Sequence, residues 1–252
     1  VGNITGVMQI INAKDGKGTV IPFGELFSQY VTFLGNNASV AIERAQMTRE
    51  IILRMIQMAE LRDPRETGSH VNRVGAYSIE IYDNLARKQS VSDAEIRKNK
   101  DLLRIAAMLH DVGKVAISDV ILKKPGSLSD EEQDVMRTHC RQGADLFHGK
   151  DGPLDIMCRD IALYHHEKYD GTGYPFQMMG DQIPLAARIV ALADVYDALI
   201  SRRVYKKAWP ESKVLELIKD QAGIHFDPML VDSFFEVYEV IEAIRRKYSD
   251  DE

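Results

Sequence analysis

The chain has 252 residues, of which 45% are hydrophobic and 28% charged, a composition that is ordinary for a globular protein. This length suffices for one large domain, or for one domain with a smaller companion. The net charge of -6 at pH 7 gives no global signal for binding a DNA or RNA duplex or an anionic membrane surface. An anionic ligand would need local positive charge, which bound metal ions can provide.

Cysteine usage and hydropathy bear on location. Cys140 and Cys158 form no CxxC pair, so neither a thiolate metal site nor a disulfide framework is predicted, and a reducing cytoplasm fits best. No signal peptide is evident, no apolar run approaches the roughly 18 residues of a membrane span, and we expect no membrane contact by this segment. The chain begins at Val1 without Met, which indicates a piece of a longer protein that could itself be membrane-attached.

Residues 1–22 differ from the rest of the chain. Residues 7–12 form an apolar strand candidate, residues 15–18 carry a turn signal, and residues 19–21 read as a second short strand. Two strands are not stable alone, so they must pack on another element or be the remnant of a larger domain.

A helical pattern follows from Phe23 to about Arg62. Apolar residues at positions 47, 51, 55 and 58 recur at helical spacing and form a wide stripe. Gly35 weakens the middle, so one kinked helix and two helices both fit. The stripe either faces its own domain or pairs with its copy in a homodimer, and the pattern does not choose between these.

After Pro64 the chain reads as helices joined by turns. Ser92 and Ser129 each precede a glutamate by three residues, which is the capping-box signature. Further helices are predicted to start at Pro153, at Pro184, and at Asp227-Pro228, the last running to about Tyr248. The predicted fold is mainly all-α, with a short N-terminal β/α segment.

Histidines and carboxylates recur at helix positions that suit metal binding. Glu66 and His70 are four residues apart and share one helix face. His110 and Asp111 directly follow an apolar helix, where an unpaired polar pair would be costly and a shared metal would remove the cost. A carboxylate such as that of Asp111 can also bridge two cations.

The second half of the chain adds matching residues. His139 follows the Ser129 cap, His165-His166 lead into the turn of residues 170–175, and Asp194 lies on an apolar helix where an unpaired charge is penalised. Each has an ordinary explanation by itself: Asp194 could pair with Arg188, and Asp111 could cap the turn at Gly113. Together they favour a metal site. His148 and His225 fit no pattern and are interpreted as structural.

Two motifs in this set resemble the HD-GYP family of bacterial cyclic-dinucleotide phosphodiesterases. They are His110-Asp111-Val112-Gly113-Lys114 and the longer, more specific run from His165-His166-Glu167 to Gly173-Tyr174-Pro175. The resemblance covers residues 59–235, and neither motif departs from the family pattern. It implies a helical HD-domain bundle with a central metal site.

The resemblance also implies ligand sets. One metal would be held by His70, His110, Asp111 and Asp194. A second would be held by His139, His165 and His166, with Asp111 bridging. Glu66 stands where some members bind a third metal, so the resemblance favours a trinuclear centre over a binuclear one. Iron or manganese is the expected metal.

Further roles are implied around these ligands. Lys114 resembles the lysine that contacts the scissile phosphate, and Arg203 and Lys206 resemble residues that hold phosphate. Tyr174 is expected to contact a guanine base, and Asp197, one turn after Asp194, to support the metal ligands from behind. The catalytic residues are then Asp111 and Lys114.

The N-terminal part resembles the C-terminal part of a GAF sensor domain. The resemblance rests on residues 6–14, Phe23 and residues 38–45. It implies three parts: a GAF-like remnant (1–45), a linker helix (46–62) and a catalytic HD-GYP domain (63–252). The remnant is expected to serve as a packing or dimerisation element.

The expected reaction is hydrolysis of cyclic di-GMP to linear pGpG, which can be cut again to GMP, by metal-activated hydroxide. Cyclic GMP-AMP is an alternative substrate. Three further interpretations compete with this reaction: a general HD-domain phosphohydrolase acting on nucleotides or (p)ppGpp, a non-catalytic cyclic-dinucleotide receptor, and a structural zinc site. The zinc site is disfavoured because structural zinc sites are four-coordinate and usually contain cysteine.

Overall fold

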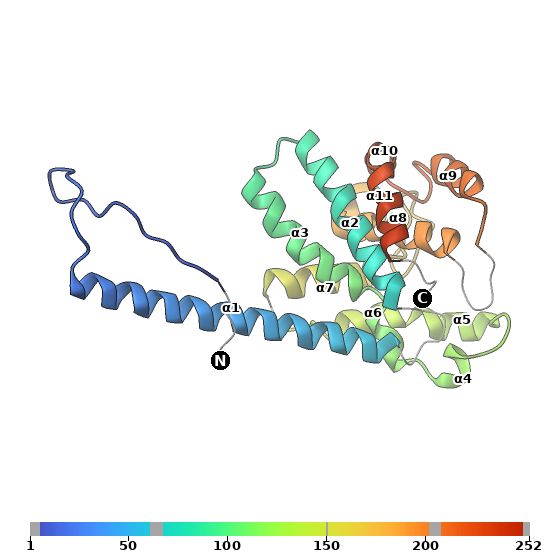
Figure 1. Ribbon diagram of the computed structural model, residues 1–252. Helices are drawn as coiled ribbons and strands as arrows, with labels where there is room; N and C mark the ends of the chain where they lie inside the picture. Colours follow the sequence, from blue (N-terminus) through green and yellow to red (C-terminus); the bar gives the residue numbers. More distant parts are fainter. Residues whose placement is uncertain (1–5, 61–67, 150, 202–207, 249–252) are drawn as a thin grey trace. The chain divides into compact units, whose positions relative to one another are not determined.

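The computed structural model describes residues 6–60, 68–149, 151–201 and 208–248. Within them the chain is helical and contains no strand, which confirms the mainly all-α prediction (Figure 1). The chain forms two compact units, Val1–Met55 and Ile56–Glu252. None of the described helices combines the length and apolarity needed to cross a bilayer.

In the first unit, the turn at residues 15–18 is present but the two predicted strands are not. Asp15 Oδ1 accepts hydrogen bonds from the backbone of Lys17 and Thr19, and one antiparallel bridge joins Lys14 to Val20. The pairing goes no further because residues 7–12 find no partner in this unit. Val7, for example, is 91% exposed, and a strand pair without a buried face is marginal.

The helical pattern of residues 23–62 forms one continuous helix, α1 (Glu25–Glu60), in which Gly35 is accommodated. Of the two arrangements that the sequence left open, the single helix is correct. Many of its large apolar side chains are exposed, including Tyr30, Phe33 and Met55.

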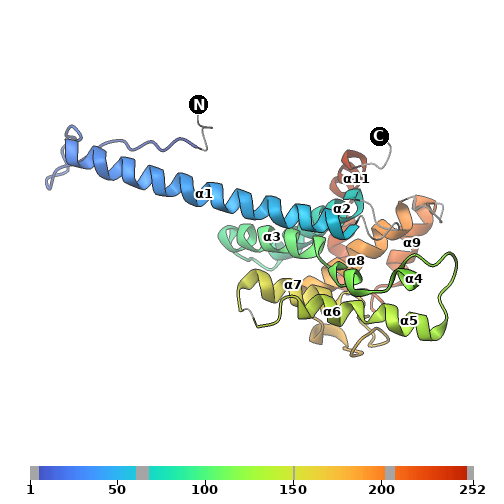
Figure 2. The same ribbon diagram turned by 90° about the horizontal axis from the view of Figure 1, so that it is seen from below.

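The second unit is a bundle of short and medium helices (Figures 1 and 2). Its elements in chain order are α2 (Gly68–Lys88), α3 (Asp93–Met108), the 3-10 helix η1 (Val112–Ala116), α4 (Asp119–Leu122), α5 (Asp130–Arg137), α6 (His139–Asp145), α7 (Pro153–Tyr164), the 3-10 helix η2 (Gly180–Gln182), α8 (Leu185–Ile200), α9 (Glu211–Asp220), α10 (Pro228–Glu236) and α11 (Tyr238–Lys247).

Most helix starts follow the predicted local signals. Ser92 accepts a hydrogen bond from the Glu95 backbone, and Ser129 with Glu132 completes a capping box at α5. Pro153 is the first residue of α7, and Pro184 directly precedes α8.

Two predicted helices are each divided. The helix after Ser129 ends at Arg137, and His139 begins α6 instead. The final helix is broken at Val237 into α10 and α11. Phe234 and Ile241, on the two sides of that break, are both fully buried.

The hydrophobic core lies among α2, α3, α7, α8, α10 and α11. Tyr77 of α2, Tyr196 of α8 and Phe234 of α10 are fully buried and meet edge to face, with centroids 5.4 Å and 5.0 Å apart. α8 is apolar around most of its circumference, as is usual for a helix that is covered on several sides. Such a helix can hold Asp194 and Asp197 only if other groups compensate them.

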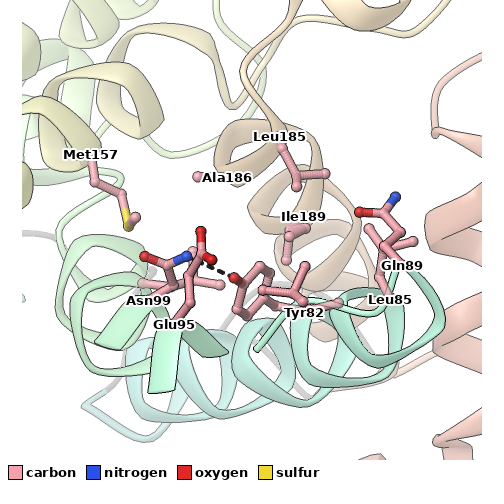
Figure 3. A pocket seen from close by; sticks show the side chains of 12 residues that line it. Tyr82, Leu85, Gln89, Glu95, Asn99, Met157, Leu185, Ala186 and Ile189 are labelled. Carbon is pink, nitrogen blue, oxygen red and sulfur yellow. Dashed lines mark hydrogen bonds between the residues drawn. The ribbon is translucent and has the colours of Figure 1, made fainter. Parts of the chain in front are cut away.

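A cavity of about 310 Å³ opens between α2, α3, α7 and α8 (Figure 3). Apolar side chains such as Leu103, Met157 and Ile189 line most of it. Asn99 donates a hydrogen bond to the Tyr82 hydroxyl at its edge. None of the histidines predicted to bind metal lines this cavity.

Candidate metal centre

Five segments of the second unit bring the predicted ligands together. His70 comes from α2, His110 and Asp111 from the turn after α3, and His139 from the start of α6. His165 and His166 end α7, and Asp194 comes from α8. Among the described residues these side chains form two groups whose ligand atoms lie within 4.8 Å of one another: His70, His110 and Asp194, and His139, Cys140, His165 and His166.

The first group surrounds the Asp194 carboxylate. Asp194 Oδ1 lies 3.4 Å from His70 Nε2 and 3.9 Å from His110 Nε2. These separations suit atoms that share one ion, because ligands about 2.1 Å from a metal lie roughly 3 to 4 Å apart.

Asp111 lies between the two groups. Its Oδ2 atom is 3.3 Å from His110 Nε2, while its Oδ1 atom is 3.1 Å from His139 Nε2 and 3.6 Å from His165 Nε2. One carboxylate oxygen therefore faces each group. This arrangement allows a single carboxylate to bridge two cations.

Local hydrogen bonds hold the histidine rings in place. His110 Nδ1 bonds the Ala107 carbonyl at 2.7 Å, and His139 Nδ1 bonds the Met136 carbonyl at 2.7 Å. His165 Nδ1 lies 3.0 Å from the Ile161 carbonyl, at the end of α7. In each case the turn of helix preceding the histidine supplies the acceptor, so Nε2 is directed into the centre in the orientation that metal ligands commonly have.

Asp197 holds the His70 ring in place. Its Oδ2 atom lies 2.8 Å from His70 Nδ1, and it also accepts two bonds from Arg73, so that His70 Nε2 is aimed at Asp194. Burial raises the pKa of Asp197, but His70 and Arg73 outweigh it and hold the pKa below its usual value. The sequence predicts Asp197 behind the ligands but not Arg73, whose spacing from His70 gives no signal.

The buried polar atoms of the second group fit a metal ion. His165 is fully buried, and its Nε2 atom has no hydrogen-bond partner among the described residues, since Asp111 at 3.6 Å is too far. Burial lowers the pKa of His165, and burial together with His165 holds the pKa of His166 well below its usual range. Both imidazoles are therefore neutral near pH 7, which is the form that binds metals.

The Asp111 carboxylate carries the negative charge at the centre. Burial would raise the pKa of Asp111, but Lys114 and His110 outweigh it and hold that pKa well below its usual range. Burial lowers the pKa of His139, but the hydrogen bond to Asp111 reverses the shift and raises it to about 10. His139 Nε2 and Asp111 Oδ1 thus face each other at 3.1 Å as an acid and base pair from which a cation can displace a proton.

Lys114 lies on η1 beside the bridging carboxylate, with Nζ 2.7 Å from Asp111 Oδ2. Its ammonium group contributes to the low pKa of Asp111. The 3-10 helix that begins at Val112 turns the chain tightly, so the Lys114 side chain can reach the Asp111 carboxylate.

The loop of residues 167–178 covers one side of the centre. Tyr174 packs on His166 with ring centroids 4.8 Å apart, and the Arg137 guanidinium lies 5.3 Å from the centre of the Tyr174 ring. Glu167, which belongs to the second motif but was assigned no role from the sequence, is buried and accepts hydrogen bonds from the backbone of Phe176 and Met178. Gly173 passes so close to the backbone of Glu167 and Lys168 that no Cβ fits there.

The ordinary explanations weighed for single residues do not hold. Arg188 donates to Asp181 and Asp227, each at 2.7 Å or less, and not to Asp194. Asp111 precedes η1, but its side chain makes no capping hydrogen bond. Cys140 lies among the second group, whereas its sequence context had predicted no thiolate metal site. Glu66, Arg203 and Lys206 lie outside the described residues.

These features define an all-helical protein with a buried histidine and aspartate centre that suits divalent metal ions. The pattern described as the HD domain matches residues 40–230, about three quarters of the sequence, and the chain belongs to the HD-domain family.

Two curated relatives come from Vibrio cholerae serotype O1. A cyclic di-GMP phosphodiesterase is 42% identical over 230 residues, covering 87% of this chain and 46% of the relative. The 3'3'-cGAMP-specific phosphodiesterase 2 is 36% identical over 226 residues, covering 90% of this chain and 42% of the relative. The chain thus spans less than half the length of either relative.

A solved structure shares the fold. The cyclic GMP-AMP-specific phosphodiesterase structure from V. cholerae superposes with a TM-score of 0.52 at 19% identity, covering 79% of this chain and 51% of that one.

Proposed function

We propose that this chain is an HD-GYP phosphodiesterase that hydrolyses cyclic di-GMP to linear pGpG, with GMP as the product of a second cleavage. The observation that carries the proposal is the position of Asp111, whose two oxygens face separate groups of buried ligand atoms. The identity to a relative named as a cyclic di-GMP phosphodiesterase supports the choice of substrate.

In this proposal the ligands of one divalent metal are His70, His110, Asp111 and Asp194, and those of a second are His139, His165 and His166 with Asp111 shared. Glu66 would contribute to a third ion, and iron or manganese is favoured. Bound metals of this kind supply a hydroxide nucleophile near neutral pH and neutralise charge on the phosphate.

The chain's own residues then bind and orient the substrate. Lys114, beside the bridging carboxylate, is placed to contact a non-bridging phosphate oxygen and to stabilise the charge that develops there. Arg203 and Lys206 are proposed to hold phosphate, and Tyr174 to contact a guanine base. Asp197 keeps His70 in its ligating orientation.

Cyclic GMP-AMP is the second candidate substrate, because a relative at 36% identity is named as specific for it. Both substrates present the same phosphodiester to the centre, so the metal ligands do not distinguish them. The choice must depend on contacts to the bases, for which Tyr174 is the candidate residue.

Product analysis tests the function. The protein, prepared anaerobically and loaded with ferrous iron or manganese, is incubated separately with cyclic di-GMP, cyclic GMP-AMP and (p)ppGpp, and the products are separated by chromatography. We expect pGpG from cyclic di-GMP, and no product from Asp111→Ala, whose helical content by circular dichroism stays near that of the native chain.

Three results would replace the proposal. Turnover of (p)ppGpp alone would favour a general HD-domain phosphohydrolase. Tight binding of the cyclic dinucleotide by the metal-loaded protein without any turnover would favour a receptor. Unfolding of Asp111→Ala would favour a structural metal site.

We also propose that residues 1–45 derive from a GAF-like domain and that residues 46–62 act as a linker helix. The proposed location is the bacterial cytoplasm.

We further propose that the chain forms a homodimer through α1. The exposed apolar side chains of α1, such as Met47, Ile51 and Met55, support the dimer. Sedimentation equilibrium should show a dimer for the native chain and a monomer for Ile51→Asp. A native monomer at micromolar concentration would contradict it.

A further inference from the structure

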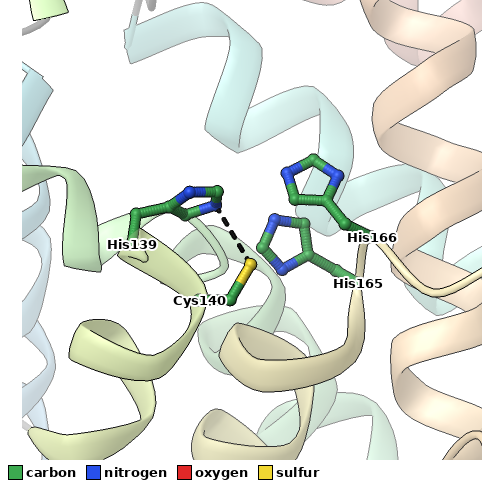
Figure 4. Close-up of side chains that lie close together, drawn as sticks. All are labelled: His139, Cys140, His165 and His166. Atoms are coloured by element: carbon green, nitrogen blue, oxygen red, sulfur yellow. Dashed lines mark hydrogen bonds between the residues drawn. The ribbon is translucent and has the colours of Figure 1, made fainter. Parts of the chain in front are cut away.

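Cys140 lies inside the second group of ligand atoms rather than beside it. Its side chain is fully buried, and its Sγ atom is 3.5 Å from His139 Nε2 (Figure 4). The same sulfur lies within 4.8 Å of the ligand atoms offered by His165 and His166. Three imidazole nitrogens and one sulfur thus converge on one small volume.

The spacing matches that of ligands around a common ion. A metal bound at about 2.3 Å by sulfur and about 2.1 Å by nitrogen separates the two ligand atoms by roughly 3.1 Å at an angle of about 90° and by roughly 3.6 Å at a tetrahedral angle. The sulfur to nitrogen distance at Cys140 and His139 is 3.5 Å. His139 Nε2 also faces the bridging carboxylate of Asp111. A cysteine that only filled the core would not need to place its sulfur beside this nitrogen.

A second observation points to a ligand at this position. The Nε2 atom of fully buried His165 is directed into the same volume and has no hydrogen-bond partner among the residues described. Leaving such a buried atom unsatisfied is costly, and a shared cation would remove that cost.

Cys158 provides the contrast within the same chain. It is also fully buried, but it belongs to the hydrophobic core cluster beneath α7 and lies in neither group of metal-ligand atoms. Burial raises the pKa of the Cys158 thiol to about 12, so it stays protonated and inert. The two cysteines therefore differ in surroundings and not in exposure.

We propose that Cys140 is a fifth protein ligand, as a thiolate, of the metal held by His139, His165 and His166 together with the shared Asp111. The inference rests on the metal centre of the proposed function. On coordination the Cys140 thiol releases its proton to solvent, and the sulfur forms a bond to the cation. A sulfur ligand makes this site softer than one built from imidazole and carboxylate alone, so it should favour zinc, cobalt and ferrous iron over manganese.

Cobalt(II) titration of the apoprotein under anaerobic conditions tests this inference. A cobalt–thiolate bond gives a sulfur-to-metal charge-transfer band in the near ultraviolet, which nitrogen and oxygen ligands do not give. We expect the band in the native chain and in the matched control Cys158→Ala. We expect it to be absent from Cys140→Ala and from Cys140→Ser, with cobalt affinity at this site lowered by about tenfold or more.

The outcomes are separable from those for hydrolysis. Cobalt bound by the native chain without the band, or a band that persists in Cys140→Ala, would overturn the Cys140 assignment and leave the phosphodiesterase proposal intact. A thiolate band in a protein that turns over no cyclic dinucleotide would overturn the proposed reaction and leave Cys140 as a ligand. Failure of the native chain to bind cobalt at all would overturn both. Circular dichroism confirms that each variant is folded.

Discussion

At the scale of single residues, the centre depends on a glycine that lets two elements approach. A Cβ atom on Gly113 would collide with the His139 carbonyl and with the backbone of Gly143. The obstacles are backbone atoms, which cannot rotate away as a side chain can. Gly113 therefore sets the distance between η1 and α6, and with it the distance from Asp111 to His139.

Gly113→Ala should force these two elements apart. We expect the free energy of unfolding to fall by about 1 to 3 kcal/mol, as for overpacked sites, and hydrolysis to fall further because the carboxylate shifts against its partners. Urea denaturation and kcat measure the two effects. Gly35→Ala, where the added carbon meets only ordinary contact at 3.5 Å, should not lower stability. Equal stability of Gly113→Ala and the native chain would show that the contact is not tight.

Glu167 is a positioning residue for the loop over the centre. Its two oxygens accept hydrogen bonds from Phe176 N at 2.7 Å and Met178 N at 3.1 Å, and its carboxylate is buried. In Glu167→Gln an amide NH₂ group replaces one acceptor and faces a backbone N–H, which costs about 1 to 3 kcal/mol.

We expect Glu167→Gln to raise KM for the cyclic dinucleotide by roughly tenfold through displacement of the loop that carries Tyr174, because about 1.4 kcal/mol corresponds to a factor of ten. Metal content by elemental analysis should stay unchanged, which separates positioning from loss of ligands. Glu239→Gln, at an exposed carboxylate, is the matched control. A native KM in Glu167→Gln would refute the role of the loop anchor.

At the scale of elements, one arginine joins three helices behind the metal ligands. Arg73 of α2 donates to Asp197 of α8 through Nε at 2.7 Å and Nη2 at 3.0 Å. Its Nη1 atom donates to the carbonyl of Tyr248, just past α11, at 2.7 Å. The bidentate geometry is one that lysine cannot reproduce.

Arg73→Met should leave the buried Asp197 carboxylate with His70 as its remaining partner among these groups. Removing one member of a buried ion pair costs about 3 to 5 kcal/mol, so we expect a large loss in urea stability and weaker binding of the metal that His70 would hold. Arg159→Met, which breaks a partly exposed contact of 3.6 Å with Asp160, should cost under about 1 kcal/mol. Similar losses in the two variants would argue against a special role for Arg73.

At the scale of the whole molecule, His225 makes folding sensitive to acid. Its ring stacks on Phe226 with centroids 4.4 Å apart, and its backbone carbonyl accepts a hydrogen bond from Tyr169 N, which joins the start of α10 to the loop over the centre. Burial, followed by the nearby Lys168 charge, lowers the pKa of His225 to about 4 from an ordinary value of 6.5.

As the pH is lowered from 6.5 to about 4, His225 takes up a proton in the unfolded chain but not in the folded one. The free energy of unfolding should therefore fall across this window. Above this window both states are neutral at His225, and below it both are protonated. The loss attributable to His225 across the whole window is on the order of 3 kcal/mol. Urea denaturation at a series of pH values should give a flatter profile for His225→Gln than for the native chain, with the difference confined to this window. Parallel profiles would refute it.

Local signals in the sequence were enough to predict the helical class, most helix starts and the candidate metal ligands. Ser129 and Pro153 act within one helical turn, so their effects follow from neighbours in the chain. The ligand candidates could be named because adjacent polar pairs such as His110-Asp111 stand out at the end of an apolar helix. The strands expected near residues 7–12 were wrong, because a strand forms only with a partner and the sequence cannot supply one.

Relations that join distant segments required the tertiary structure. Arg73 pairs with a residue 124 positions away, and Cys140 reaches the histidines of another helix, so no local pattern marks either residue. Neither break, at Thr138 or at Val237, is marked by a proline or a glycine, so neither could be predicted from local signals. Helix propensity depends on a few neighbouring residues, whereas tertiary packing depends on the whole surface that each helix buries against others. Packing contributes more to the stability of a helix in a folded protein than propensity does.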